Sequence, residues 1–230
     1  MIDGILLINK ERGITSYDVI RKLKKILPKG QKIGHAGTLD SFATGLLIIL
    51  LGRSTKQMNM ILQLEKEYIV KGEFGYSTDT QDITGKKISV DTELSQISEE
   101  EIRNEIERKF LGSILQMPPQ FSAKKIKGKK AYEYARKGEK VNLKPKEVDV
   151  YQFDIVNYDW PMVSFKIVCS SGTYIRTLVN DLGINLGTYA TAVELERTKI
   201  GKFLLKDALK SEDIGEDVNL NLIECESDKG

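Results

Sequence analysis

The stretch that decides the fold is IGHAGTLDSFATGLLIILLG, residues 33–52. Glycine permits positive φ and close approach of the backbone to other groups, and the stretch has it at four positions: Gly34, Gly37, Gly45 and Gly52. The first two bracket His35, the only histidine of the chain, and Asp40 follows. An apolar run over residues 46–51 predicts a buried strand. From spacing alone, two interpretations stand: a glycine-rich turn capped by Asp40, or a loop that holds a histidine and a carboxylate for chemistry.

The literal sequence favours the second interpretation. GHAGTLD at residues 34–40, followed by ATGLL at residues 43–47, resembles the signature of the bacterial tRNA pseudouridine synthase B family. That family isomerises the uridine of the T-loop of tRNA to pseudouridine. The resemblance implies that Asp40 is the catalytic carboxylate and that His35 binds the RNA. The family usually has proline after the aspartate, and this chain has Ser41, which we expect to loosen the backbone there.

The residues before this stretch predict a strand and a helix. GILLIN, residues 4–9, fits a buried strand, and a helix capped by Thr15 or Ser16 follows, with apolar residues on one face. KERGITS, residues 10–16, is similar to the family pattern KPxGxTS without its proline. On its own Lys10 is an ordinary surface lysine, and only the resemblance implies that it supports the active site as a substrate-binding residue.

A strand with a tyrosine follows a predicted helix over residues 54–64. Residues 67–76 alternate between apolar and polar, so Tyr68 shares a face with Val70 and Phe74. A tyrosine on such a face is an ordinary core residue. The family resemblance of KEY, residues 66–68, implies instead that Tyr68 stacks on the target base, which offsets part of the cost of unstacking it.

The middle of the chain combines scaffold with a basic segment. Residues 98–110 predict a helix that begins with a capping box of Ser98 and Glu101. Five lysines then crowd residues 124–130, with Tyr132 and Tyr134 just beyond. Lysines interleaved with aromatic residues suit RNA binding, although a solvated surface loop has the same composition. The resemblance implies that residues 116–147 form an RNA-clamping insertion with a short helix ending at Gly138.

The last motif places an arginine near a helix start. Strands are predicted over residues 146–156 and 163–170, and SGTYIR, residues 171–176, opens a helix. Arg176 is misplaced against the helix dipole, so it requires a carboxylate or phosphate partner. The resemblance implies that Arg176 pairs with Asp40, and that Tyr174 and Leu195 line the uridine pocket.

Composition excludes several classes of protein. The chain has 230 residues with no apolar run as long as a membrane span, and its two cysteines, Cys169 and Cys225, have no metal-ligand spacing. We therefore expect a reduced cytoplasmic protein with no metal and no cofactor. Residues 211–230 carry a charge of −6 and the whole chain +2, so the other residues carry +8, which suits a polyanionic substrate.

The resemblance covers about residues 4–210 and implies an α+β fold: a curved, mixed and mostly antiparallel sheet flanked by helices. We expect residues 1–210 to form a catalytic domain, and residues 211–230 to form a short acidic tail that is no complete RNA-binding (PUA) domain. The expected partner is the T-arm of tRNA, and the family suggests a monomer. Two alternatives are an RNA-binding or tRNA-folding protein on the same scaffold, and a synthase that acts on other RNA stem-loops.

Overall fold

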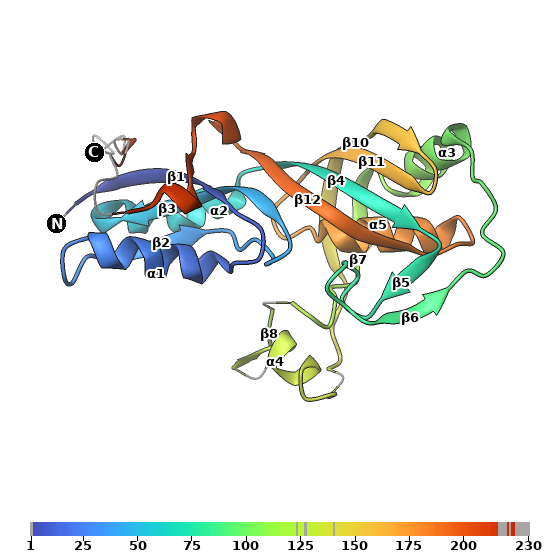
Figure 1. The fold of residues 1–230 in the computed structure, drawn as a ribbon, viewed down its shortest axis with the longest axis horizontal. Coiled ribbons are helices and arrows are strands. Elements are labelled where there is room, and N and C mark those ends of the chain that lie inside the picture. The colour runs from blue at the N-terminus through green and yellow to red at the C-terminus, as the bar shows by residue number, and fades with distance from the viewer. Residues whose placement is uncertain are drawn as a thin grey trace. The chain divides into compact units, whose positions relative to one another are not determined.

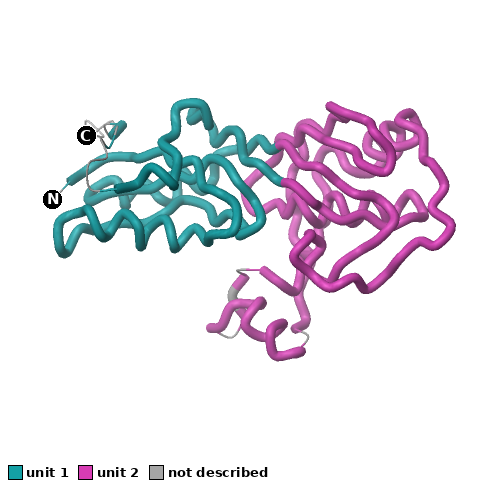
Figure 2. Tube along the Cα trace, in the orientation of Figure 1, with its two compact units in different colours: residues 1–68, 195–230 teal, residues 69–194 magenta. Residues whose placement is uncertain are grey.

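The computed structural model describes residues 2–122, 124–126, 128–139, 141–215, 220 and 222–223. The chain divides into two compact units (Figure 2): unit 1 consists of residues 1–68 and 195–230, and unit 2 of residues 69–194. Two strands, β4 (Lys66–Phe74) and β12 (Ala190–Ile200), have residues in both units. Strands and helices are interspersed along the chain (Figure 1), and the fold is α+β with a mixed, mostly antiparallel sheet and flanking helices, as the resemblance implied.

The sheet of unit 1 is built on two apolar strands. β1 (Gly4–Lys10) and β3 (Thr44–Leu51) pair antiparallel, from Gly4 opposite Leu51 to Lys10 opposite Gly45. The leucines and isoleucines of β3 are fully buried on both faces, which is why this strand is an unbroken apolar run. β2 (Ile33–Ala36) adds to β3, and β12 pairs with β3 in parallel. Shorter elements complete the unit: β13 (Phe203–Leu204), β14 (Leu209–Lys210) and the 3-10 helices η2 (Leu205–Asp207) and η3 (Ser211–Asp213).

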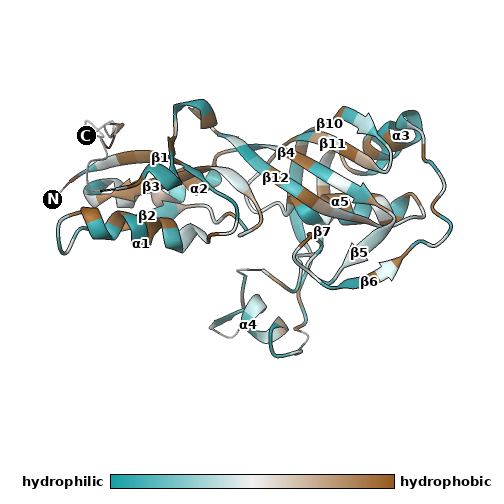
Figure 3. Ribbon diagram, viewed as in Figure 1, coloured by the Kyte–Doolittle hydropathy of each residue, from teal (hydrophilic) through white to brown (hydrophobic). Residues whose placement is uncertain are grey.

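Two helical segments flank this part of the sheet. α1 (Ser16–Ile26) begins at the N-cap Thr15, whose side chain accepts from the backbone N–H of Asp18 while the Asp18 carboxylate accepts from Thr15. Its apolar positions face the core, and its polar face is exposed (Figure 3). The helix predicted over residues 54–64 is instead a 3-10 helix, η1 (Gly52–Gln57), followed by α2 (Met58–Gln63).

Unit 2 holds the rest of the sheet in the order β12-β4-β11-β10-β7. β10 (Lys146–Asp159) and β11 (Met162–Cys169) form a long antiparallel hairpin, and β7 (Gly112–Gln116) pairs with the start of β10. Residues of β4 and β11 alternate between buried and half-buried, which is the period-2 pattern of a strand with one core face. A separate hairpin consists of β5 (Tyr76–Thr78) and β6 (Lys87–Val90).

The two longest helices described in unit 2 are α3 (Glu99–Lys109) and α5 (Ile175–Asn185). The predicted capping box of Ser98 and Glu101 is present at the start of α3. Within residues 116–147 the chain forms two paired strands of two residues each, β8 (Lys125–Ile126) and β9 (Lys129–Lys130). The short helix α4 (Ala131–Ala135) follows them. This helix ends three residues before Gly138, because a turn with positive φ at Gly138 follows it.

Candidate active site

The loop between β2 and β3 carries Asp40, and its backbone is fixed by side chains of unit 1. Ser16, the first residue of α1, is fully buried and uses its hydroxyl twice: it accepts from the Leu39 N–H at 2.9 Å and donates to the Leu39 carbonyl at 3.2 Å. The Ala43 N–H bonds to the Asp40 carbonyl at 3.2 Å and closes a turn. The loop therefore holds Asp40 half-buried between two anchored neighbours.

Ser41, where the family usually has proline, lies on the other side of Asp40. Its carbonyl accepts a hydrogen bond from the Gly13 N–H at 2.7 Å. We expected Ser41 to loosen the backbone after Asp40. This hydrogen bond ties the backbone there to the segment before α1, and because a proline carbonyl could accept it equally well, the loosening by Ser41 stays a prediction.

Lys10 lies beneath the same loop and is fully buried. Its ammonium group donates three hydrogen bonds, to the carbonyls of Glu11 at 2.8 Å, Ile14 at 3.0 Å and Ala43 at 2.6 Å. Burial lowers the pKa of Lys10 to about 8, and the negative charge of Asp40 partly opposes that shift. The sequence alone suggested a surface lysine, and the resemblance a substrate-binding one. Its burial contradicts the surface location, and the enclosed ammonium group holds the Asp40 loop from the protein interior; substrate binding by Lys10 stays a prediction.

Arg197, on β12, is a second buried cation that sequence reasoning missed. Its side chain is only 2% exposed, and it donates from Nε to the Leu46 carbonyl at 2.7 Å and from Nη2 to the Gly37 carbonyl at 3.0 Å. These two carbonyls lie on either side of Asp40 in the sequence, so one guanidinium joins the two ends of the loop. The sequence pattern could have indicated its burial, because Arg197 lies two residues after Leu195 and therefore shares the buried face of the strand.

Two glycines make this arrangement possible. Gly37 has φ +92° and Gly45 has φ +104°, values that other residues rarely adopt. Gly45 of β3 lies opposite Arg197 of β12 in the sheet. A Cβ atom at Gly45 would lie 2.4 Å from the carbonyl oxygen of Arg197. The glycine therefore lets β3 approach β12 closely, and the backbone of Arg197 fills the space.

Three other predicted site residues belong to unit 1. His35 is half-buried on β2, opposite Ile49 of β3. Tyr68 on β4 and Leu195 on β12 are both buried, at 8% and 7% exposure, on strands that are neighbours in the sheet. Thr198 joins these two strands beside Tyr68, since its hydroxyl donates to the carboxylate of Glu67 at 2.7 Å.

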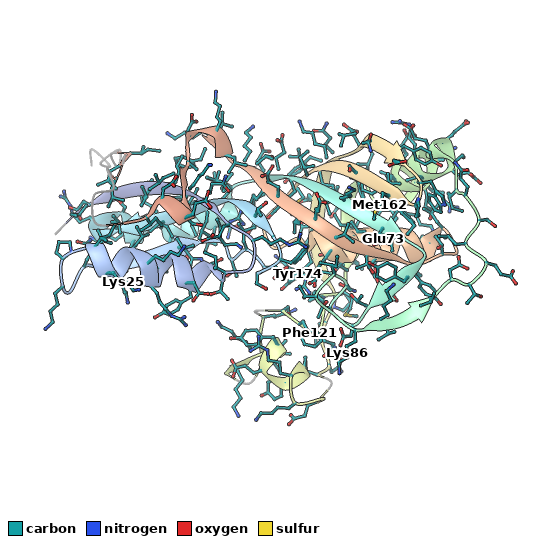
Figure 4. The ribbon with its side chains drawn as sticks, viewed as in Figure 1. Lys25, Glu73, Lys86, Phe121, Met162 and Tyr174 are labelled. Carbon is teal, nitrogen blue, oxygen red and sulfur yellow. The ribbon has the colours of Figure 1, made fainter. Side chains whose placement is uncertain are left out.

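Tyr174 and Arg176 come together at the start of α5 in unit 2. Tyr174, labelled in Figure 4, exchanges two backbone hydrogen bonds with the side chain of Gln116: its N–H donates at 2.8 Å and its carbonyl accepts at 3.0 Å. Arg176 is 3% exposed and donates from Nη1 to the Thr80 carbonyl and from Nη2 to the Phe121 carbonyl, both at 2.6 Å. Its guanidinium lies 6.0 Å from the centre of the Tyr174 ring.

A buried carboxylate also faces Arg176. Asp82 lies 3.6 Å from Nη1 and accepts from the Thr84 N–H at 3.0 Å and from the Thr80 hydroxyl at 2.9 Å. The polar turn predicted over residues 77–85 thus folds around Asp82 and presents its backbone to the arginine. Asp40 belongs to unit 1 and Arg176 to unit 2, and their pairing remains a prediction.

The described residues offer neither a metal site nor a membrane-spanning helix. Among them, no group of three or more histidine, cysteine, aspartate or glutamate side chains has the arrangement of a metal site. Within the same residues, none of the helices combines the length and apolar character needed to span a bilayer.

Comparison with known proteins gives one family. The model described as TruB family pseudouridylate synthase (N terminal domain) matches residues 24–175. The chain is 44% identical over 216 residues to the tRNA pseudouridine synthase B of Clostridium tetani, covering 94% of this chain and 74% of that protein. It is 45% identical over 212 residues to that of Endomicrobium trichonymphae, covering 92% of this chain and 91% of that protein. It is 39% identical over 230 residues to that of Parabacteroides distasonis, covering 98% of this chain and 97% of that protein.

Solved structures agree with this result. A Cbf5-Nop10-Gar1 complex contains a chain that is 26% identical, with a TM-score of 0.68 over 91% of this chain. An archaeal box H/ACA sRNP Nop10-Cbf5 complex gives 26% identity and a TM-score of 0.66 over 92% of this chain. The match spans about half the length of each of those chains, at 53% and 52%.

Proposed function

We propose that this chain, which belongs to the TruB family of pseudouridylate synthases, isomerises the T-loop uridine of tRNA to pseudouridine. The reaction breaks the N1–C1′ bond, turns the base and forms a C5–C1′ bond, with no net oxidation and no group donor. The enzyme is therefore an isomerase. The names of the relatives and the GHAGTLD motif support tRNA as the substrate, and we expect a monomer that acts in the cytoplasm.

The observation that carries the proposal is the anchoring of the Asp40 loop. A catalytic carboxylate must be held within reach of the sugar or base before the RNA arrives, because positioning supplies much of the rate. Lys10, Ser16 and Arg197, all buried, bond to backbone atoms of this loop. Burying polar and charged groups is costly. The use of three such groups to hold one short loop indicates that the conformation of this loop is important. We assign the catalytic carboxylate to Asp40 on this basis.

The remaining side chains are assigned to the uridine and its surroundings. Tyr68 stacks on the base that is turned out of the RNA, and this stack offsets part of the unstacking cost of a few kcal/mol. Leu195 and Tyr174 line the pocket around that base. His35 contacts the T-loop from which the base is taken, and acts on the RNA fold.

Arg176 is assigned as the cation that pairs with Asp40. The support is its rigidity: its Nη1 and Nη2 atoms each bond to a backbone carbonyl, of Thr80 and of Phe121. Because these hydrogen bonds already fix the planar guanidinium, it loses little conformational entropy when it pairs with a carboxylate.

Residues 116–147 are assigned as the RNA clamp. Lys124, Lys129 and Lys130 belong to this segment, and Tyr132 has two cations near its ring, with Lys130 Nζ at 5.5 Å and the Arg136 guanidinium at 5.2 Å from its centre. Cations beside an aromatic ring suit contacts with phosphates and unpaired bases.

The test is pseudouridine formation by the wild-type protein on an unmodified tRNA transcript, with the modified position mapped. We expect conversion of the T-loop uridine and no other. A transcript with cytidine at that position is the matched control and should yield none. Binding without conversion would overturn the proposal in favour of an RNA-binding protein. Conversion of an isolated hairpin but not of intact tRNA would point to other stem-loops as substrates.

A further inference from the structure

We propose that the exposed face of α1 is a separate RNA-binding surface, which holds the phosphate backbone of the substrate beside the Asp40 loop. This α1 basic face consists of Tyr17, Arg21, Lys24 and Lys25. The identity of the partner rests on the proposed function, since the RNA it binds is the substrate of that reaction. The surface lies outside the clamp of residues 116–147 and outside the residues assigned to the uridine.

The helix geometry places these four side chains on one stripe. They stand at positions i, i+4, i+7 and i+8, which an α-helix brings within about a quarter of a turn of one another. All four are exposed, and Lys25 extends away from the ribbon in Figure 4. The opposite side of α1 is held in the core by its buried apolar residues, Val19, Ile20 and Leu23. The orientation of the α1 basic face is therefore fixed.

Two of the three cations on this face, Lys24 and Lys25, are not neutralised by another described residue. Asp18 is the single acidic residue of the helix, and it pairs with Arg21 at 2.6 Å. Lys22 points elsewhere, to Glu11 at 2.6 Å. Among the described residues, Lys24 and Lys25 form no ion pair. Arg21 stands three and four residues from these lysines, a like-charge spacing that costs an isolated helix a few tenths of a kcal/mol.

Helix α3 is an ordinary solvated helix of the same chain, and its basic residues form ion pairs within the helix. It also has 11 residues and an exposed charged face. There Arg103 pairs with Glu99 at 2.6 Å, Lys109 pairs with Glu105 at 3.0 Å, and Arg108 pairs with the same glutamate. The contrast indicates that the uncompensated charge of α1 has a partner outside the protein.

The location of the face selects the partner. α1 begins at Ser16, whose hydroxyl bonds to the backbone of Leu39, the residue before Asp40. The face begins beside this contact and extends about 12 Å along the helix, at 1.5 Å per residue. An RNA whose uridine reaches Asp40 therefore brings neighbouring phosphates to the lysines. A bilayer is a poor fit, because a helix bound to lipid buries its apolar side there, and that of α1 lies in the core.

Tyr17 adds an aromatic surface at the end nearest the Asp40 loop. Its side chain is 52% exposed, and the Arg21 guanidinium lies 5.1 Å from the ring centre. An exposed ring beside cations can stack on an unpaired base while the cations contact phosphates. The face thus combines the two kinds of contact that bind single-stranded or looped RNA.

The test compares Lys24→Gln/Lys25→Gln with the control Arg103→Gln/Lys206→Gln. Both variants lose two exposed positive charges, and glutamine preserves helix propensity. Dissociation constants for an unmodified tRNA transcript are measured over a series of salt concentrations, together with kcat at saturating tRNA. Each lysine that contacts a phosphate contributes about 0.7–0.9 to the slope of log K against log salt.

We expect the α1 variant to lose about 1.4–1.8 from the magnitude of that slope, to bind several-fold more weakly at low salt, and to keep its kcat. A dissociation constant and slope equal to those of the wild-type protein would overturn the proposal. So would an equal loss in both variants, since that reports net charge alone. The readout is binding, so its failure is distinct from an absence of pseudouridine formation by the wild-type protein.

Discussion

The replacement Arg197→Met removes the guanidinium that joins the two ends of the Asp40 loop while keeping a long unbranched side chain. The carbonyls of Gly37 and Leu46 lose their hydrogen bonds, which are 3.0 and 2.7 Å long. The arginine side chain and its bond to Leu46 are buried, so water does not replace the lost donor there, whereas the bond to Gly37 is part-buried and its loss costs less.

The magnitude follows from these two bonds. A buried polar group left without a partner costs about 1–3 kcal/mol, so two carbonyls cost about 2–6 kcal/mol. The variant also avoids the cost of burying a charge, which reduces the net loss. We expect the free energy of unfolding to fall by about 2–4 kcal/mol. Since displacement of a reacting group by about 1 Å can lower a rate on the order of 100-fold, we also expect kcat to fall by at least tenfold.

The assay combines urea unfolding with pseudouridine formation at saturating tRNA, at a temperature where the variant is folded. Arg53→Met is the control, because Arg53 pairs with Asp3 at the surface of the same unit and is 84% exposed. Its loss should change the unfolding free energy by less than about 1 kcal/mol and leave kcat unchanged. A folded Arg197→Met protein with wild-type kcat would show that the loop keeps its conformation without the guanidinium.

Three further predictions concern backbone space, a buried charge and a helix cap. Gly45→Ala should destabilise the protein by several kcal/mol more than Gly13→Ala in urea unfolding, because both glycines have positive φ but only Gly45 faces a contact, at 2.4 Å. Equal losses would exclude the contact as the cause. Lys10 has a pKa of about 8 when folded and 10.5 ordinarily, so the unfolded chain binds more protons between these values. The unfolding free energy of the wild type, measured relative to Lys10→Met, should therefore rise by roughly 3 kcal/mol from pH 8 to above pH 10; a flat difference would contradict the burial. Ser98→Ala should cost about 1 kcal/mol in thermal unfolding through loss of the capping box, and no change would mean that the cap is dispensable.

The sequence predicted the elements whose determinants are local. The apolar run over residues 46–51 and the alternation after Lys66 have the periods of their strands, and both are buried as expected. The cap at Ser98 depends on two residues three apart, so it was visible without tertiary structure. The 3-10 start at Gly52 was missed, because its φ of +55° and its tight turn depend on the strand before it.

The supports of the candidate site were harder to predict, because they depend on contacts between distant segments. Lys10 donates to Ala43, 33 residues away, and Arg197 to Gly37, 160 residues away. A lysine in the motif gave no sign that it is buried, since charged residues are almost always exposed. Asp40 was found through the literal motif and not through spacing, because a glycine-rich turn with an aspartate has many structural uses.

The most direct test of the central claim is the effect of Asp40→Asn on pseudouridine formation in an unmodified tRNA transcript, with tRNA binding measured in parallel. Asparagine preserves the size of the side chain and removes its charge. Asp207→Asn, at an exposed aspartate of the same unit, is the control and should behave as the wild type. We predict that Asp40→Asn binds tRNA with nearly unchanged affinity and forms no pseudouridine above background. Pseudouridine formation by Asp40→Asn at a rate near that of the wild type would contradict the assignment of Asp40 as the catalytic carboxylate.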